Sequence, residues 1–243
     1  MKKVILLSAI SASILASEIS DKALDLIKSM MPSDKIEIKL ENTEKLDDTG
    51  FEMIEFGIYQ DGNKLGEDIV FSNGVILSPE IVNIKSSKNY KLEYSQKKEE
   101  QKKAQIVGKI PNFLKEHKDI VIFLGDSKAS VADVVFSDPD CPYCRKHLEY
   151  LMQTKEIKPT AFILTPLPMH KDALAKSVLI LDEIKKAKND KDKLEVLKKY
   201  FAQVDFKAPA NDKLDKYKKV TDVIFYDLGI SATPSIFENV KIK

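Results

Sequence analysis

The chain contains the apolar segment Val131-Ala132-Asp133-Val134-Val135-Phe136, and after four intervening residues comes Cys141-Pro142-Tyr143-Cys144. These are the only two cysteines among 243 residues. The apolar segment predicts a buried strand. The cysteine pair predicts the start of a helix, with the first sulfur at its N-terminus and the second about one turn inside. Such a pair suits a reversible dithiol/disulfide couple, so the sequence predicts thiol–disulfide exchange.

Cys141 is expected to be the attacking nucleophile of the pair. Free backbone N–H groups and the positive end of the helix dipole favour a thiolate at this position. Pro142 suits the first helical position, because its φ is preset and it has no N–H to leave unpaired. Cys144 lies deeper and is expected to resolve the mixed disulfide. Arg145-Lys146-His147 follows at once and is expected to add positive charge near the site.

Two other uses of a cysteine pair have to be weighed. A structural zinc site takes four ligands, commonly two such pairs. This chain offers one pair and three histidines, His117, His147 and His170, of which only His147 is close in sequence. A purely structural disulfide across a two-residue loop would remove little chain entropy. Ligand count and loop length therefore favour redox chemistry, and no metal is expected.

The N-terminus predicts export. Met1-Lys2-Lys3 is basic, and residues 4–16 are apolar or small and carry no charge. Residues 1–16 therefore resemble a signal peptide cleaved after Ala16, and the run is too short for a membrane span. An uncleaved signal anchor is the alternative. An exported chain of this length can bury its own core without disulfides, so one cysteine pair is expected to act on other proteins.

Net charge argues against one class of partner. The full chain carries +1, and loss of Lys2 and Lys3 takes the basic count from 39 to 37 against 38 acidic residues. A mature chain near −1 lacks the electrostatic footprint of a nucleic-acid-binding protein. No nucleic-acid partner is therefore expected.

Residues 17–95 predict a small α+β domain. Asp61-Gly62-Asn63-Lys64 is a hairpin turn signal between two apolar runs. The domain contains no Cys or His, so binding or oligomerisation is its expected role. Its expected elements are a helix at 18–31 and strands at 35–40, 51–59, 66–71, 75–77 and 81–84.

Residues 96–118 predict a helical linker, and residues 119–243 a second domain. The linker begins with polar, helix-favouring residues and contains a single proline, Pro111. A turn is expected at 237–240, followed by a short strand at 241–243. The other expected elements are strands at 120–125, 131–136 and 160–164 and helices at 141–153, 171–187, 191–204 and 213–228. Residues 230–237 are expected to be a loop that enters a strand.

Three features resemble the exported thiol–disulfide isomerases of the DsbC/DsbG type, within the thioredoxin-fold superfamily. The segment Val135–Cys144 is similar to that family's active-site segment. The segment Leu228–Ser235 is similar to its Gly-(Val/Ile)-x-x-Thr-Pro loop. The order of parts is the third: a signal peptide, a small domain, a helical linker and a domain with a helical insertion.

The resemblance implies an α/β thioredoxin-like catalytic domain with a helical insertion, and an N-terminal cystatin-like dimerisation domain. It implies that Pro234 is a cis-proline facing the cysteines. Cys141 and Cys144 would be catalytic. Pro142, Tyr143, Thr233 and Pro234 would bind substrate. A thioredoxin fold ends in a hairpin and a helix, and the nine residues after Pro234 predict that this last helix is absent.

The implied activity is isomerisation or reduction of incorrect disulfides in misfolded exported proteins, in the periplasm. The implied protein is a V-shaped homodimer, kept reduced by a membrane thiol reductant of the DsbD type. It needs no cofactor beyond the Cys141–Cys144 redox pair. A dithiol oxidase that introduces disulfides, and a chaperone-like protein with secondary redox activity, are alternatives that the sequence leaves open.

Overall fold

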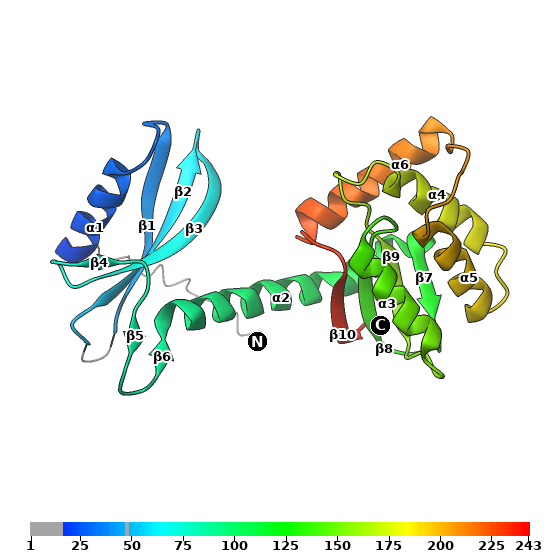
Figure 1. The fold of residues 1–243 in the computed structure, drawn as a ribbon, viewed down its shortest axis with the longest axis horizontal. Helices are drawn as coiled ribbons and strands as arrows, with labels where there is room; N and C mark the ends of the chain where they lie inside the picture. The colour runs from blue at the N-terminus through cyan, green and yellow to red at the C-terminus, as the bar shows by residue number, and fades with distance from the viewer. Residues whose placement is uncertain (1–16, 47–48) are drawn as a thin grey trace, which may run out of the picture. The chain divides into compact units, whose positions relative to one another are not determined.

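The computed structural model describes residues 17–46 and 49–243, which form two compact units (Figure 1). One unit ends at Glu99 and the other begins at Glu100. This division falls inside the segment 96–118 expected to be a linker. The predicted signal peptide, residues 1–16, lies outside the described residues.

The first unit packs a helix, α1 (Glu18–Ser29), against an antiparallel sheet, as Figure 1 shows. The strand order is β1-β2-β3-β4, and a separate small ladder pairs β5 with β6. This is the α+β content expected for residues 17–95. The strands are β1 (Ile36–Lys45), β2 (Glu52–Gln60), β3 (Asn63–Ser72), β4 (Leu77–Ser78), β5 (Val82–Asn83) and β6 (Lys88–Asn89).

The predicted hairpin turn joins β2 to β3. Asp61 and Gly62 have φ values of 50° and 79°, and they connect the paired residues Gln60 and Asn63. Two consecutive positive φ values are the requirement of a type I′ turn, which asparagine, aspartate and glycine tolerate best. The local prediction from Asp61-Gly62 is therefore confirmed.

Helix α1 is fixed at its N-terminus by a capping box. The Ser17 side chain accepts the Ser20 N–H at 3.0 Å, and Ser20 Oγ accepts the Ser17 N–H at 2.9 Å. Ser17 Oγ also donates to Glu52 Oε2 at 2.6 Å, which ties the helix start to β2. Ala23 and Ile27, one helical turn apart, are the buried apolar residues of α1.

A second apolar cluster in this unit joins Ile69 and Phe71 of β3 to Leu46 and to Tyr90, the first residue of α2 (Tyr90–Glu116). The Phe71 and Tyr90 rings lie 6.4 Å apart. Asn89 Oδ1 accepts the Leu92 N–H at 3.0 Å, so α2 has a side-chain cap seven residues before the predicted linker begins.

The later part of α2 belongs to the second unit. Its buried residues Ile106, Ile110, Phe113 and Leu114 recur at helical spacing and enter the main core of that unit. Lys109 Nζ donates to the Asp227 carbonyl at 2.6 Å, which fixes this part of the helix to the segment after α6.

The second unit has a four-stranded mixed sheet in the order β10-β8-β9-β7. β8 and β9 are parallel, and the two outer pairs are antiparallel. Because β8 and β9 are central, their residues form a nearly continuous buried run. The strands are β7 (Val121–Leu124), β8 (Val131–Ser137), β9 (Thr160–Leu164) and β10 (Ser235–Lys241).

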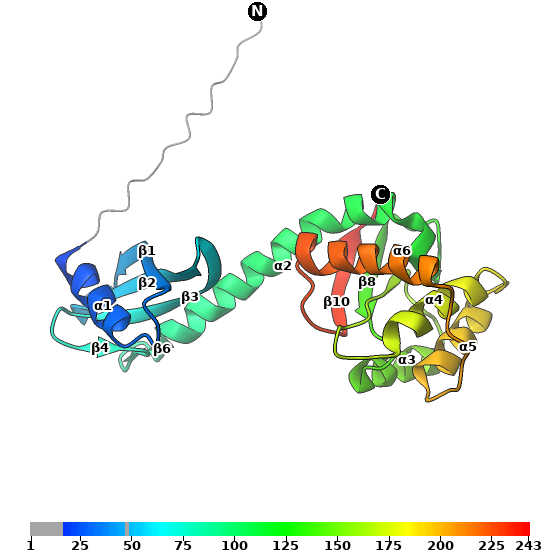
Figure 2. The same cartoon turned by 90° about the horizontal axis from the view of Figure 1, so that it is seen from above.

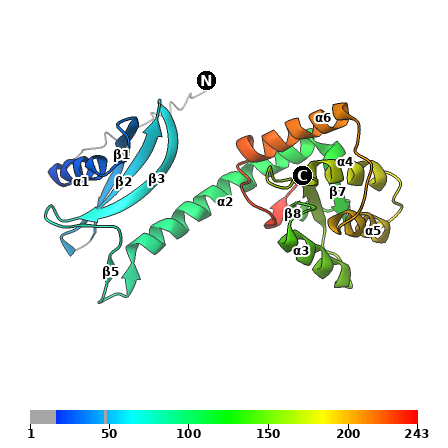
Figure 3. The ribbon, with the colours of Figure 1, turned by 45° about the horizontal axis from the view of Figure 1, so that its top comes forward.

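Helices cover both faces of this sheet. Figures 2 and 3 show α3 (Pro142–Gln153) on one face, and α6 (Asn211–Asp222) with the later part of α2 on the other. α3 is the crossover that two parallel strands require. Between β9 and β10 the chain inserts α4 (Ala173–Ile184), α5 (Asp190–Phe201) and α6, and then the π-helical turn η3 (Val223–Asp227).

At the end of the second unit, the structure differs from one prediction. The prediction of a turn at 237–240 is wrong, because strand β10 runs through these residues. Phe237 pairs with Val134 and Val240 pairs with Ala132, so two residues of β10 face one residue of β8. This bulge takes the place of the turn: Asn239 has a φ of 55° and its N–H donates to Asp133 Oδ1 at 2.9 Å.

No helix within residues 17–46 and 49–243 is long and apolar enough to cross a membrane.

Candidate redox site

The cysteine pair lies where β8 passes into α3. Cys141 is the N-cap of the helix, with φ −76° and ψ 123°, and its carbonyl accepts the Arg145 N–H at 3.1 Å. Pro142 occupies the first helical position. Cys144 is one turn inside and fully buried, while Cys141 is 5% exposed. Both are free thiols. The predicted placement of the pair is therefore confirmed.

The Thr233–Pro234 loop reaches the same place from far along the chain. The peptide between Thr233 and Pro234 is cis, as the resemblance implies. Cys141 Sγ lies 3.4 Å from the Thr233 carbonyl oxygen, to which it donates. The contact arises because β10 pairs with β8, and Ser235 stands opposite Phe136. The structure therefore brings together the two segments that carry the resemblance.

Cys144 lies in the apolar core of the second unit, and a few hydrogen-bond donors are near its sulfur. The Asp138 N–H points at Sγ across 3.2 Å. Burial raises the pKa of the Cys144 thiol to about 11, while the Asp138 N–H and the hydroxyls of Ser137 and Thr233 act in the opposite direction. The thiol is therefore protonated at neutral pH unless a reaction step removes its proton.

We expect iodoacetamide to alkylate Cys144 at pH 8 at least about a hundredfold more slowly in the folded reduced protein than in urea. A pKa of about 11 leaves about one thiol in a thousand ionised at this pH, and burial limits access further. Mass spectrometry of the Cys144 peptide after timed quenching measures both rates. Equal rates in the two conditions would contradict the buried, protonated thiol.

A buried carboxylate, Asp138, organises the loop before the cysteines. It is fully buried, and Oδ1 accepts the Asp140 N–H at 2.7 Å. Oδ2 accepts the Leu167 N–H at 2.6 Å and lies 2.8 Å from His170 Nδ1. His170, named from the sequence only among the three histidines, is thus attached to the active-site loop.

A charged pair fixes the residue immediately before Cys141. Lys176 of α4 is buried, and its Nζ lies 2.6 Å from Asp140 Oδ1 and 3.2 Å from the Ala202 carbonyl. Arg145 Nε donates to the Phe201 carbonyl at 2.7 Å. The helical insertion therefore holds both sides of the Cys141 position. Sequence reasoning missed Asp138, Asp140 and Lys176 as site residues. The only signal for them was two aspartates directly before the cysteines.

His147 does not supply the charge expected from the sequence. It is half-buried, and burial lowers the pKa of its imidazole, so the ring is neutral near pH 7. Its Nδ1 atom is buried and has no hydrogen-bond partner in the described part of the chain.

Apolar side chains near the dithiol are exposed. Tyr143, between the two cysteines, is 68% exposed, and Met169, which precedes His170, is 74% exposed. Pro142 is exposed as well. Exposed apolar groups beside a reactive pair suit contact with a polypeptide substrate. A substrate-binding role for Pro142, Tyr143, Thr233 and Pro234 stays a prediction.

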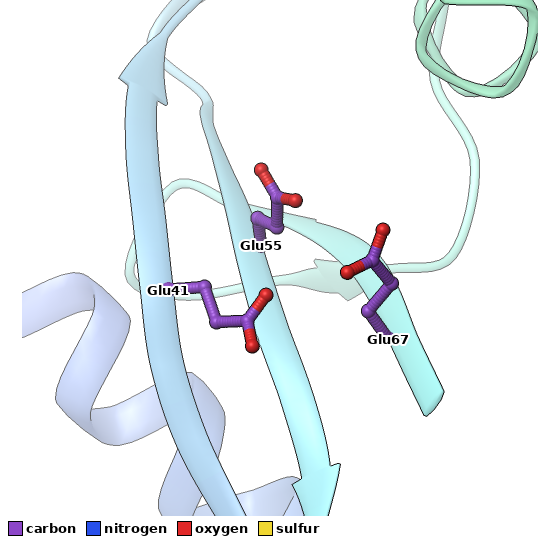
Figure 4. Close-up of side chains that lie close together, drawn as sticks. All are labelled: Glu41, Glu55 and Glu67. Atoms are coloured by element: carbon purple, nitrogen blue, oxygen red, sulfur yellow. The ribbon is translucent and has the colours of Figure 1, made fainter. Parts of the chain in front are cut away.

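The first unit contains a cluster of three carboxylates, shown in Figure 4: Glu41 from β1, Glu55 from β2 and Glu67 from β3. Lys64 bridges Glu41 and Glu67 at 2.7 and 2.6 Å. Lys98 pairs with Glu55 and lies 3.1 Å from Glu67. Two ammonium groups thus offset the three carboxylates, and the cluster is an ion-pair network across the sheet.

The site geometry and the sheet define the architecture of the second unit. β8 leads into a cysteine pair at a helix N-terminus, β9 follows in parallel, and β10 enters antiparallel after a cis-proline. The second unit has a thioredoxin-like fold.

No protein-family model and no curated protein matches the chain. Solved structures do match. Helicobacter pylori DsbG is 20% identical, over 89% of this chain and 99% of that chain, with a TM-score of 0.47. A linker-deletion variant of Proteus mirabilis ScsC is 20% identical, over 61% and 82%, with a TM-score of 0.42. The thiol–disulfide exchange protein α-DsbA2 from Wolbachia pipientis is 17% identical, over 55% and 90%, with a TM-score of 0.35.

Proposed function

We propose that this protein isomerises or reduces incorrect disulfides in exported proteins. One observation carries the proposal: Cys141 caps a helix and lies 3.4 Å from the backbone of Thr233, with Cys144 buried behind it. A nucleophilic sulfur beside the backbone of a loop that leads into a strand can receive an extended polypeptide, which is the substrate that a protein disulfide presents. Exposed Tyr143 and Met169 extend this surface with apolar groups.

The chemistry is a sequence of balanced exchanges. The Cys141 thiolate attacks one sulfur of a substrate disulfide, forming a mixed disulfide and releasing the other substrate sulfur as a thiolate. That thiolate, or another one, can attack the mixed disulfide and leave the substrate with a new pairing. If re-pairing stalls, Cys144 loses its proton and attacks Cys141. The substrate then leaves reduced and the protein retains a Cys141–Cys144 disulfide.

The first test is recovery of active ribonuclease from its scrambled form, with Cys141→Ser as the control. We expect wild-type protein to restore ribonuclease activity and the variant not to. Rapid oxidation of reduced ribonuclease, without recovery of the scrambled form, would instead identify a dithiol oxidase. Suppression of aggregation that survives loss of both cysteines, without ribonuclease recovery, would identify a chaperone-like protein.

We further propose that the first unit is a cystatin-like dimerisation domain. Its sheet has β1 at an edge, and the described part of the unit holds no cysteine or histidine that could do redox chemistry. An edge strand can pair with a second copy of the chain. Sedimentation of the full chain should give twice the monomer mass, and a monomer at micromolar concentration would rule out the dimer.

A cell compartment and a redox partner complete the proposal. The basic and apolar residues 1–16 support export to the periplasm. An isomerase must be reduced to attack, so we propose a membrane thiol reductant of the DsbD type as its electron donor. Acid trapping and alkylation of periplasmic extract should find Cys141 and Cys144 reduced. A fully oxidised pair in that fraction would contradict this assignment.

A further inference from the structure

Two buried hydroxyl groups at the site have no hydrogen-bond partner. In the chain as described, from 17 to 46 and from 49 to 243, Ser137 Oγ and Thr233 Oγ1 are both enclosed and unpaired. Ser137 is fully buried. Folded proteins pair almost all buried polar groups, because an unpaired one loses its hydrogen bonds to water without replacement. Two such hydroxyls at one site call for a functional reason.

Both hydroxyls lie beside the sulfur of Cys144. They are near enough to lower the pKa of the thiol, although neither contact has the geometry of a formed hydrogen bond. The Asp138 N–H, at 3.2 Å, is a third donor to the same sulfur. Three donors from two separate segments, residues 137–138 and Thr233, therefore surround one atom.

The backbone holds these donors in place. Ser137 is the last residue of β8, where it pairs with Leu164, and its carbonyl accepts the Thr165 N–H at 2.7 Å. Thr233 lies two residues before Ser235, the first residue of β10, which pairs with Phe136 of β8. The donors are thus fixed by the sheet and the loop, and they do not depend on the charge state of Cys144.

The charge state of the sulfur explains why the hydroxyls are unpaired. A thiol is a weak acceptor, so hydroxyls beside it gain little in the resting protein. A thiolate is a strong acceptor, and in a buried site its hydrogen bonds are stronger than in water. Hydroxyls whose backbone is already in place need only a small side-chain adjustment when the charge appears, so little energy is lost to rearrangement, as in an oxyanion hole.

We propose that Ser137 Oγ–H, Asp138 N–H and Thr233 Oγ1–H form a thiolate-stabilising site for Cys144, with Ser137 as a further catalytic residue. The inference rests on the proposed disulfide chemistry and adds to it a group that acts on the buried sulfur.

The site acts whenever the Cys141–Cys144 bond forms or breaks. During reduction, a reductant thiolate attacks Cys141 Sγ, the bond to Cys144 breaks, and the electron pair leaves on Cys144 Sγ. The three donors then hold that charge until a proton arrives. A more stable leaving thiolate leaves faster. In the reverse step, Cys144 attacks a mixed disulfide at Cys141. This step passes through the same transition state, so the three donors stabilise that transition state equally in both directions.

The test is the rate at which dithiothreitol reduces the preformed Cys141–Cys144 disulfide. The protein contains no tryptophan, so timed acid quenching, alkylation and mass spectrometry would follow the reaction. Ser137→Ala should slow reduction about tenfold, the effect of losing one hydrogen bond to a charged group. Ser137→Thr, which keeps a hydroxyl, should retain most of the rate. Ser177→Ala is the matched control, because this buried serine donates to the Ala173 carbonyl at 2.7 Å within α4.

Thr233→Val removes the second hydroxyl at nearly constant volume and should slow reduction in the same way. It keeps the test decisive if Ser137→Ala does not fold. Wild-type rates in whichever of these variants folds, judged by thermal unfolding, would overturn the inference. A wild-type protein that forms no Cys141–Cys144 disulfide would instead overturn the proposed function.

Discussion

Replacing Cys141 with serine is expected to lower the rate of insulin reduction by a factor of about 10³ or more. The hydroxyl of serine is not ionised near neutral pH, and no base in direct contact with the Cys141 side chain is recorded within the described residues to activate it. Cys144 cannot substitute for Cys141, because it is fully buried and burial raises its pKa to about 11. The turbidity of the precipitating insulin B chain, with dithiothreitol as electron donor, measures the rate.

Cys144→Ser is the informative partner to this variant. It retains the attacking sulfur and loses the group that releases a stalled substrate. Mixed disulfides between Cys141 and substrate should therefore accumulate, visible as higher-mass bands on non-reducing gels that disappear with reductant. If mixed disulfides accumulated at Cys144 in the Cys141→Ser variant, Cys144 would be the attacking sulfur and Cys141 the resolving one.

Replacing Asp138 with alanine is expected to lower the free energy of unfolding of the second unit by about 3 kcal/mol. The fully buried carboxylate accepts the N–H groups of Leu167 and Asp140 and contacts His170. Removal leaves these groups without their partner and opens a cavity in the loop. For a unit of this size the loss corresponds to a melting temperature about 6–12 °C lower, measured by circular dichroism.

Two further variants show which contact of Asp138 accounts for the loss of stability. Asp172→Ala removes an exposed carboxylate before α4 and should change the melting temperature little. His170→Ala removes only one partner of Asp138, and its side chain is partly exposed, so it should cost about 1 kcal/mol. A melting temperature for Asp138→Ala equal to that of wild type would show that the carboxylate does not organise the loop.

Much of the local structure could be predicted, because its signals lie within a few residues. The apolar run before Ser137 is strand β8, and Pro142 starts a helix with Cys141 as its cap. Asp61-Gly62 forms the turn of a hairpin. Such features depend on backbone preference and on the period of apolar residues, which a short stretch of sequence contains. The cis bond at Pro234 was implied by family resemblance and not by residue pattern.

The contacts that give the site its chemistry could not be predicted in this way. Asp138 and His170 are 32 residues apart, Asp140 and Lys176 are 36 apart, and Cys141 and Thr233 are 92 apart. Each pair meets because particular strands and helices pack side by side, and nothing in the local sequence specifies that packing. Burial also reversed a prediction, since it leaves His147 neutral. Local sequence therefore indicated which sulfur would react. Packing supplied the burial that raises the pKa of its partner Cys144 and brought Thr233 to the cysteine pair, because both effects act through space between segments that are distant in the chain.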